Sequence, residues 1–352
     1  MSEAVRAALA SCVDGRTLTL EEARLAMGAV MDGEATPAQL AALLVALRMR
    51  GETVEELAGF ATAMRERVLK VEAPTGTIDV VGTGGDGSGT FNISTAAALV
   101  VASAGVPVAK HGNRAITSRS GSADVLEALG VRIDHSAESA AASLAKLGFA
   151  FLFAPNFHPA MRHAGPTRRE IGVRTAFNLI GPLTNPAGAT RALIGVGDPA
   201  AAARIAEVAG LLGTERTTVV HGASVDELPL DGTGVAYDVS TGDVEVRGID
   251  PADYGLATAP TTALAGGSAE ENAEILESIL AGETGPRRDV VLLNAGAALV
   301  VAGSGEDLAQ GIAAARNALD TGLPRDLLAR LRAERAAAEA AAETTAPAGA
   351  PA

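Results

Sequence analysis

The sequence predicts an α/β protein with a small N-terminal helical domain and a larger α/β domain that has a mostly parallel central sheet. Three observations support this fold class. Capped helical segments occupy the N-terminal part, short apolar segments alternate with Ala-rich helical segments from Thr77 onward, and glycine-rich turns follow the first apolar segments. The chain has 352 residues, a length that suits two domains of about 100–200 residues each.

The N-terminal segment carries repeated helix-start signals. Thr19, Thr36 and Thr53 each precede a Glu or Gln by three residues, which is the spacing of a capping box. Apolar residues at helical spacing follow, as in Leu40–Leu47. The segment contains no cluster of titratable side chains, so we interpret it as a scaffold or a subunit interface. The predicted helical domain covers residues 1–72.

The larger domain, predicted over residues 73–335, alternates between strands and helices. A hairpin is predicted where Val235–Val239 and Val244–Arg247 flank a Thr-Gly-Asp turn. The tail over residues 336–352 is rich in Ala, Glu, Thr and Pro and is expected to be disordered. The predicted parallel strands are Ile78–Val81, Val106–Ala109, Phe149–Ala154, Ala192–Val196 and Thr217–His221, and helices are predicted between them, as at Thr95–Ala104 and Ala200–Leu212.

Composition and charge exclude several classes of function. The formal charge is −14, with 42 acidic and 28 basic side chains, which argues against a general nucleic-acid binder. Cys12 is the single cysteine, so neither a disulfide framework nor a cysteine metal site can form. The first residues lack a signal pattern, and the longest apolar run, Thr95–Ala109, is shorter than the ~20 residues that span a bilayer. We therefore expect a soluble, cytoplasmic protein.

A glycine-rich turn, Gly82–Thr90, follows the first predicted strand and precedes a predicted helix start. Glycines allow the backbone to approach a phosphate closely and to turn N–H groups inward as an anion nest. The following helix N-terminus adds free N–H groups, and Ser94 and Thr95 add hydroxyls. The turn lacks both the Walker and the dinucleotide-binding patterns. It favours a phosphate site, and a flexible loop without a ligand is the alternative.

A second polar turn, Lys110–Arg114 with Ser118–Asp124, follows the next predicted strand. It offers an ammonium, an imidazole, an amide and a guanidinium where open α/β sheets bind ligands. By themselves such residues are more often a solvated surface, and Ser122 can simply cap a helix. Because two such turns follow successive strands, we expect both to open onto one crevice.

These motifs closely resemble the anthranilate phosphoribosyltransferase family, and the resemblance extends from about Ala8 to Leu331. The segments that carry it are Gly82–Asp86, Asn92–Thr95, Lys110–Arg114, Ser120–Asp124, His158–Met161, Arg168–Glu170, Phe177–Pro186, Asp226–Glu227 and Asn294–Ala295.

The resemblance implies an enzyme that joins anthranilate to 5-phosphoribosyl 1-diphosphate (PRPP) and releases diphosphate. It assigns Mg²⁺ to Ser94, Asp226 and Glu227. No general acid or base is assigned, because an aromatic amine is unprotonated at neutral pH. The implied PRPP-binding residues are Gly82, Gly85, Asp86, Thr90, Asn92, Ile93, Ser94, Thr95, Lys110, His111, Gly112, Asn113, Arg114, Ala115, Ile116, Thr117, Ser118 and Ser122.

Anthranilate is assigned by the same resemblance to Gly82, Asn113 and Arg168. A guanidinium such as that of Arg168 can bind a carboxylate through two parallel hydrogen bonds. His111 and His158 are assigned to shaping this pocket, and a purely structural, hydrogen-bonded histidine is the alternative for each.

The resemblance also implies a homodimer that associates through the helical domain, with the active site at the hinge between domains. Part of residues 158–182 is expected to pack with the helical domain, so that Arg168 approaches across the cleft. Two other functions stay open. A pyrimidine-nucleoside phosphorylase would share the fold but would not need the acidic pair, and a silent PRPP-binding regulator would bind both substrates without turnover.

Overall fold

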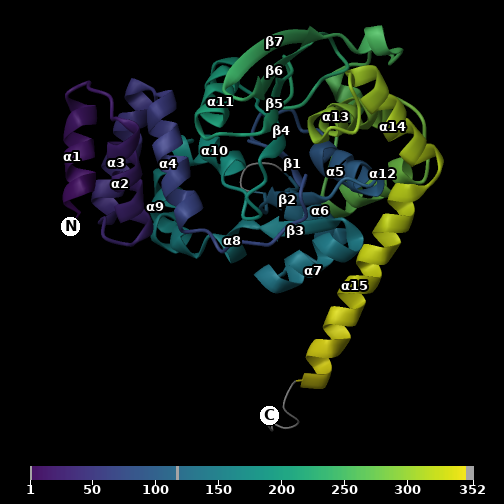
Figure 1. The fold of residues 1–352 in the computed structure, drawn as a ribbon, viewed down its shortest axis with the longest axis horizontal. Coiled ribbons are helices and arrows are strands. Elements are labelled where there is room, and N and C mark those ends of the chain that lie inside the picture. Colours follow the sequence, from purple (N-terminus) through teal and green to yellow (C-terminus); the bar gives the residue numbers. More distant parts are fainter. Residues whose placement is uncertain (1, 116–118, 346–352) are drawn as a thin grey trace.

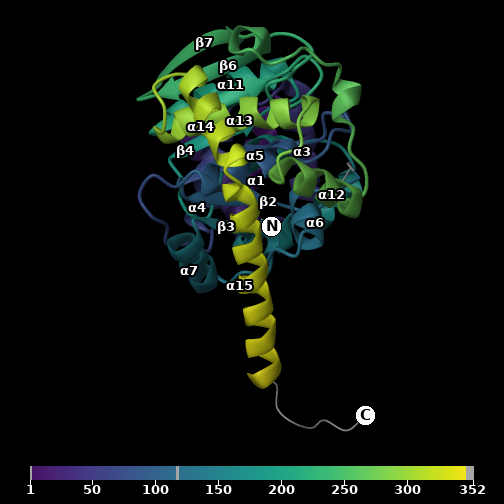
Figure 2. The ribbon, with the colours of Figure 1, turned by 90° about the vertical axis from the view of Figure 1, so that its right-hand side faces the viewer.

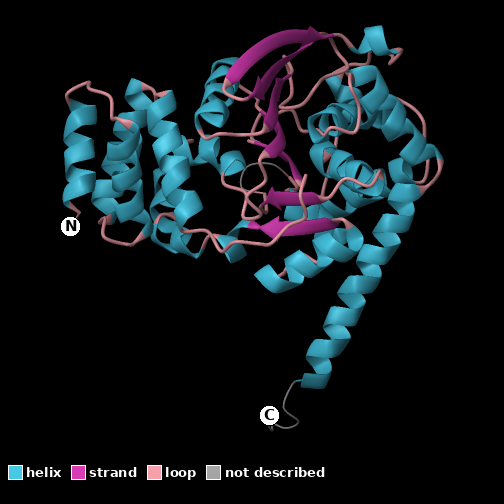
Figure 3. Ribbon diagram, in the orientation of Figure 1, coloured by secondary structure: helices cyan, strands magenta, loops and turns pink. Residues whose placement is uncertain are grey.

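The computed structural model describes residues 2–115 and 119–345. A helical bundle lies beside a larger α/β part, in which helices cover both faces of one sheet (Figures 1 and 3). Within these residues no helix is both long and apolar enough to cross a membrane. The bundle consists of α1 (Glu3–Val13), α2 (Leu20–Met31), α3 (Pro37–Arg50) and α4 (Val54–Glu66).

The three predicted N-terminal capping boxes are present. The Thr19, Thr36 and Thr53 hydroxyls accept hydrogen bonds from the third helical N–H of α2, α3 and α4, and the Glu or Gln side chain returns a bond to the cap. Pro37 occupies the first position of α3, where a missing N–H costs nothing. These local signals explain why each helix begins where it does.

Within the described residues, seven strands form one sheet in the order β3-β2-β1-β4-β5-β6-β7. The first five are mutually parallel, and β6 and β7 form the predicted hairpin, whose turn uses positive φ values at Thr241 and Gly242. The strands are β1 (Ile78–Gly82), β2 (Val108–Gly112), β3 (Phe149–Phe153), β4 (Arg191–Gly195), β5 (Arg216–His221), β6 (Gly234–Ser240) and β7 (Asp243–Ile249).

Alternating strand residues face two different hydrophobic cores. Val80 and Leu193 belong to the core beneath α5 and α13, whereas Val81 and Ile194 belong to the core shared with α11 and the bundle. The apolar strands are therefore buried on both faces, as expected of a parallel sheet. The helices of the α/β part are α5 (Ile93–Ser103), α6 (Ser122–Ala128), α7 (Ala137–Leu147), α11 (Pro199–Leu211), α12 (Ala269–Leu280), α13 (Pro286–Ala302), α14 (Leu308–Asp320) and α15 (Leu323–Thr345).

The chain returns to the bundle after β3. The short helices α8 (Ala154–Phe157), α9 (Gly165–Ile171) and α10 (Ala176–Ile180) follow β3 in the sequence, and α9 packs against α3 while α10 packs against α4. Besides this return after β3, two connections lead from the bundle to the sheet, the first after α4 and the second after α10. Backbone hydrogen bonds tie the first connection to α8, from Leu69 N to Phe157 O, and to the second connection, from Val71 N to Pro186 O.

The C-terminal helix corrects one expectation. Residues 336–345 continue α15, which extends away from the body of the protein (Figure 2), so the prediction of disorder from residue 336 is wrong over this stretch. Its Ala, Glu and Arg residues have high helix propensity, which outweighs the low-complexity composition. Residues 346–352 lie outside the described part of the chain.

Candidate active site

The sheet order places a crevice at the end of β1. In the sheet, β1 has β2 as its neighbour on one side and β4 on the other, so the strand order changes direction at β1. In open α/β sheets, ligands bind at the carboxyl ends of the strands at such a topological switch point. Gly82 and Gly195 end these two strands and are paired in register. A Cβ on Gly195 would lie 1.7 Å from the backbone oxygen of Asp226, so only glycine lets the β5–β6 loop sit here.

The glycine-rich turn folds as a nest over this crevice. Gly84, Gly85, Gly87 and Gly89 all have positive φ, between 63° and 78°. Such a backbone turns successive N–H groups inward. Asp86 fixes the turn by accepting hydrogen bonds from the backbone N and the hydroxyl of Ser88, both at 3.0 Å. The geometry agrees with an anion-binding loop.

Three carboxylates meet below the turn. Asp86, Asp226 and Glu227 each place one oxygen within 4.8 Å of the others. The backbone N–H of Gly84 donates to Asp226 Oδ2 at 2.9 Å, and the backbone N–H of Asp226 donates to Asp86 Oδ2 at 3.1 Å. The glycine turn and the acidic loop therefore position each other.

Ser94 lies beside the acidic cluster. It lines a cavity of about 10 Å³ with Gly82, Asp226 and Glu227, close to the smallest space that holds a water or an ion. Within the described part of the chain, the buried Oε2 of Glu227 has no hydrogen-bond partner. Ser94, Asp226 and Glu227 thus come together as their assignment requires, and Asp86 joins them.

The electrostatics of this cluster favour a cation. Burial, followed by repulsion from Asp86, raises the pKa of Asp226. Burial, followed by repulsion from Asp226, raises the pKa of Glu227 well above its usual value. Neighbouring carboxylates that repel each other in a dry site are the oxygen donors that Mg²⁺ prefers.

Lys110 lies beneath the cluster rather than in the open crevice. Its ammonium is buried and donates to Val80 O at 2.6 Å and to Ser94 Oγ at 3.4 Å. Burial lowers the pKa of Lys110 to about 8. The ammonium therefore orients Ser94 and compensates the carboxylates above it.

The start of α5 contributes polar groups unevenly. The hydroxyl of Thr95 is buried without a partner among the described residues, whereas the amide of Asn92 is bound to Ser120 O and to Asn272. The assignment of Ile93 to PRPP binding is wrong. Its side chain is fully buried in the core and its N–H donates to Phe91 O, so neither group can contact a ligand.

Some residues of the second polar turn face the crevice, and others are bound within the protein. Asn113 is exposed at the crevice, and Ser122 donates to its backbone oxygen at 3.4 Å. Arg114 instead binds Asp124 and Glu127 and lies over the Phe153 ring, so its guanidinium is committed within the protein. The predicted ligands Ile116, Thr117 and Ser118 lie outside the described residues. The remaining predicted residues, Gly85, Thr90, Gly112 and Ala115, lie along the two turns.

His111 and His158 form a buried pair, with ring centroids 5.1 Å apart. Each ring bonds a backbone oxygen, that of Gly181 for His111 and that of Thr184 for His158, and within the described chain neither Nε2 has a partner. Burial lowers the pKa of His111 to about 3 and of His158 to about 4. Both are neutral at pH 7, with Nε2 free to accept a hydrogen bond.

Arg168 is held on α9, on the bundle side of the molecule. Its guanidinium lies 4.7 Å from the centroid of the Phe177 ring and, among the described residues, makes no ion pair or hydrogen bond. Burial lowers the pKa of Arg168 from its usual value. A largely buried guanidinium without a carboxylate is available to bind one.

Comparison with known proteins decides the family. The chain matches the "Glycosyl transferase family, a/b domain" over residues 74–324 and the "Glycosyl transferase family, helical bundle domain" over residues 6–68. It is 53% identical over 330 residues to the anthranilate phosphoribosyltransferase of Thermomicrobium roseum, covering 92% of this chain and 95% of the relative. The chain belongs to the anthranilate phosphoribosyltransferase family.

Solved structures of this family agree with the fold. The anthranilate phosphoribosyltransferase of Thermus thermophilus is 48% identical, with a TM-score of 0.89 over 93% of this chain and 99% of that chain. The enzyme of Saccharomyces cerevisiae in complex with PRPP and Mg is 26% identical, with a TM-score of 0.87 over 96% of this chain and 99% of that chain. The predicted fold class, a helical domain plus a mostly parallel α/β domain, is confirmed.

Sequence reasoning missed several residues that build the site. Asp86 was assigned to PRPP but also belongs to the acidic cluster, and its place after Gly85 was the available signal. Asp79 and Asn185 form a buried pair at 2.7 Å, and a lone aspartate in an apolar strand could have indicated it. Arg174 donates to Gly85 O at 2.8 Å from the return segment, a contact that no sequence pattern announces.

Proposed function

We propose that this protein transfers the phosphoribosyl group of PRPP to the amino group of anthranilate, forming N-(5-phosphoribosyl)anthranilate and diphosphate, the second step of tryptophan synthesis from chorismate. The observation that carries the proposal is the meeting of an anion nest, an oxygen-rich acidic cluster and the helix α5 at one crevice. A diphosphate and its counter-ion need this combination. The names of the relatives support the same reaction.

Mg²⁺ is the metal that we assign to the acidic cluster. The donor set is all oxygen, its carboxylates repel one another, and Glu227 Oε2 lacks a partner in the described chain, so the residues fit a small hard cation. Ser94, Asp86, Asp226 and Glu227 would hold it. When bound, Mg²⁺ neutralises the charge that develops on the departing diphosphate.

The protein's own groups would then act by placement. The glycine nest and the hydroxyl of Thr95 would hold the phosphates, and the guanidinium of Arg168 would bind the anthranilate carboxylate. The amino nitrogen would attack C1 of the ribose as the bond from C1 to the diphosphate oxygen breaks. The nitrogen would then release one proton to water, because an arylammonium group does not keep its proton at neutral pH. His111 and His158, which are neutral, would accept N–H hydrogen bonds from the amine through Nε2. Orientation and leaving-group stabilisation account for catalysis without a general base.

The test is the loss of anthranilate fluorescence over time with purified protein, PRPP and Mg²⁺. We expect a decay that stops when EDTA is added. Activity with a pyrimidine nucleoside and inorganic phosphate, independent of Mg²⁺, would replace the proposal with a phosphorylase. Binding of both PRPP and anthranilate without turnover would indicate a silent regulator.

We also propose that two copies associate through the helical bundle. Large apolar side chains are exposed there, with Val13 71%, Leu25 50% and Met49 83% accessible. Sedimentation of the intact protein should give a dimer mass, and Met49→Glu should shift it toward the monomer. A wild-type monomer at micromolar concentration would contradict this assembly.

A further inference from the structure

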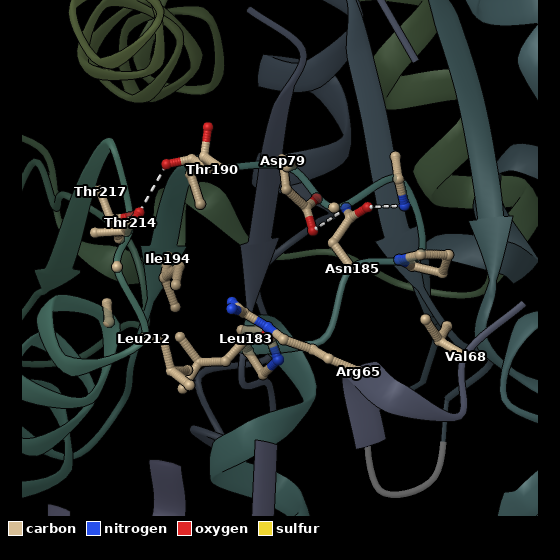
Figure 4. Close-up of a pocket in the computed structure, with 18 of the residues that line it drawn as sticks. Arg65, Val68, Asp79, Leu183, Asn185, Thr190, Ile194, Leu212, Thr214 and Thr217 are labelled. Carbon is tan, nitrogen blue, oxygen red and sulfur yellow. Dashed lines mark hydrogen bonds between the residues drawn. The ribbon is translucent and has the colours of Figure 1, made fainter. Parts of the chain in front are cut away.

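A second cavity, of about 320 Å³, lies against one face of the sheet, away from the strand ends that carry the glycine nest. Its floor is formed by Asp79 of β1, Ile194 of β4 and Thr217 of β5 (Figure 4), and residues of α11 and of the two connections to the bundle form the other walls. Asp79 is three residues before the end of β1, or about 10 Å along the strand. None of the carboxylates of the acidic cluster lines it. The volume is within the range of small-molecule sites.

Arg65, in the last turn of α4, extends into this cavity (Figure 4). Its Nε donates to Leu183 O at 2.6 Å, and within residues 2–115 and 119–345 the guanidinium has no other hydrogen bond and no ion pair. Burial lowers the pKa of Arg65 from its usual value. Arg65 is half-buried, and a charge in such a position is normally paired, because partial desolvation without a partner is costly. The two Nη groups are therefore donors that still lack an anion.

The other walls restrict the anion that fits. Asp79 is the acidic residue of the lining. Its Oδ2 already accepts a hydrogen bond from Asn185 Nδ2, and its Oδ1 accepts one from the backbone N–H of His111. Arg65 and the exposed Lys70 are the cations of the lining, and Asp79 offsets one of them, so the cavity suits a single negative charge better than a phosphate dianion. An apolar body with one carboxylate matches this lining. The apolar surface comes from Val68, Leu183, Ile194 and Leu212.

We propose that this cavity is a second ligand site, which binds a small monocarboxylate with an apolar body and pairs its carboxylate with Arg65. The occupant would contact Val68 and Val71 of the first connection together with Leu183 and Pro186 of the second. It would therefore tie the hinge segments of the bundle to the sheet. The inference does not depend on the proposed function, because binding here requires no turnover.

The experiment is calorimetric titration of full-length protein with 3-phenylpropionate and with its uncharged amide, 3-phenylpropanamide. Arg168→Gln is the background, because it weakens binding at the anthranilate position. We expect saturable 1:1 binding of the acid and at least about tenfold weaker binding of the amide. Adding Arg65→Gln should weaken binding of the acid by at least about tenfold. Adding Lys70→Gln, at an exposed lining position, should weaken it by about twofold, and salt should reduce that difference.

Three results would overturn the proposal. They are an absence of saturable binding up to about 10 mM acid, equal affinity for the acid and the amide, and an affinity that Arg65→Gln leaves unchanged. Circular dichroism checks that each variant is folded. If Arg65→Gln does not fold, the comparison of acid with amide in the Arg168→Gln protein decides by itself.

Discussion

Gly195→Ala should disable the acidic cluster while leaving the fold in place. The added Cβ would lie 1.7 Å from the backbone oxygen of Asp226, whereas a carbon and an oxygen normally stay about 3.3 Å apart. The loop that carries Asp226 must therefore move by about 1.5 Å. That movement would break the hydrogen bonds from Gly84 N to Asp226 Oδ2 at 2.9 Å and from Asp226 N to Asp86 Oδ2 at 3.1 Å.

Because a displacement of about 1 Å at a reacting centre costs on the order of 100-fold, kcat/KM should fall by about 100-fold or more. A loop absorbs the clash, so the free energy of unfolding should drop by only about 1–3 kcal/mol. The assay is the initial rate of anthranilate fluorescence loss at saturating Mg²⁺, with urea unfolding measured on the same preparation.

Gly210→Ala is the matched control. Gly210 lies inside α11, where a Cβ would make ordinary contacts at 3.5 Å with Gly242 O and Val239 Cγ1. It should keep wild-type activity and gain up to about 1 kcal/mol, because alanine loses less backbone entropy than glycine in a helix. If Gly195→Ala retains more than about a tenth of wild-type kcat/KM while folded, the packing of β4 against Asp226 does not position the acids, and the reasoning fails.

Three further outcomes are expected. Asp226→Asn combined with Glu227→Gln should abolish Mg²⁺-dependent turnover with the circular dichroism spectrum unchanged, and near-normal rates would remove the metal assignment. Arg168→Gln should raise KM for anthranilate by about tenfold or more, with KM for PRPP within about threefold, because one charge-assisted pair is lost; equal increases for both substrates would show that the residue is misplaced. His111 and His158 have lowered pKa values of about 3 and about 4, so below pH 6.5 the unfolded chain binds protons that the native state does not. The histidine contribution to the free energy of unfolding should therefore be fully present above pH 6.5 and fall on acidification toward pH 4, by up to about 1.4 kcal/mol per pH unit for each histidine. Urea titrations between pH 4 and 7 should give a shallower slope for His158→Gln, and equal slopes would contradict the buried, neutral assignment.

Local signals in the sequence were sufficient for most elements. Capping boxes at Thr19, Thr36 and Thr53 mark helix starts that the structure has, because a cap acts over four consecutive residues. The exception was the segment after residue 336, where composition suggested disorder and helix propensity prevailed.

The sequence by itself determined the fold class and the residue types of the site, since strand alternation, helix caps and glycine turns depend on neighbours along the chain. Only the tertiary structure decided which of these residues act together. Asp86 and Asp226 are 140 positions apart yet are joined by a hydrogen bond, and packing places the guanidinium of Arg65 in a cavity where it has no anionic partner among the described residues. Such contacts depend on strand order and helix packing, because burial and charge pairing arise from the whole fold and not from local sequence.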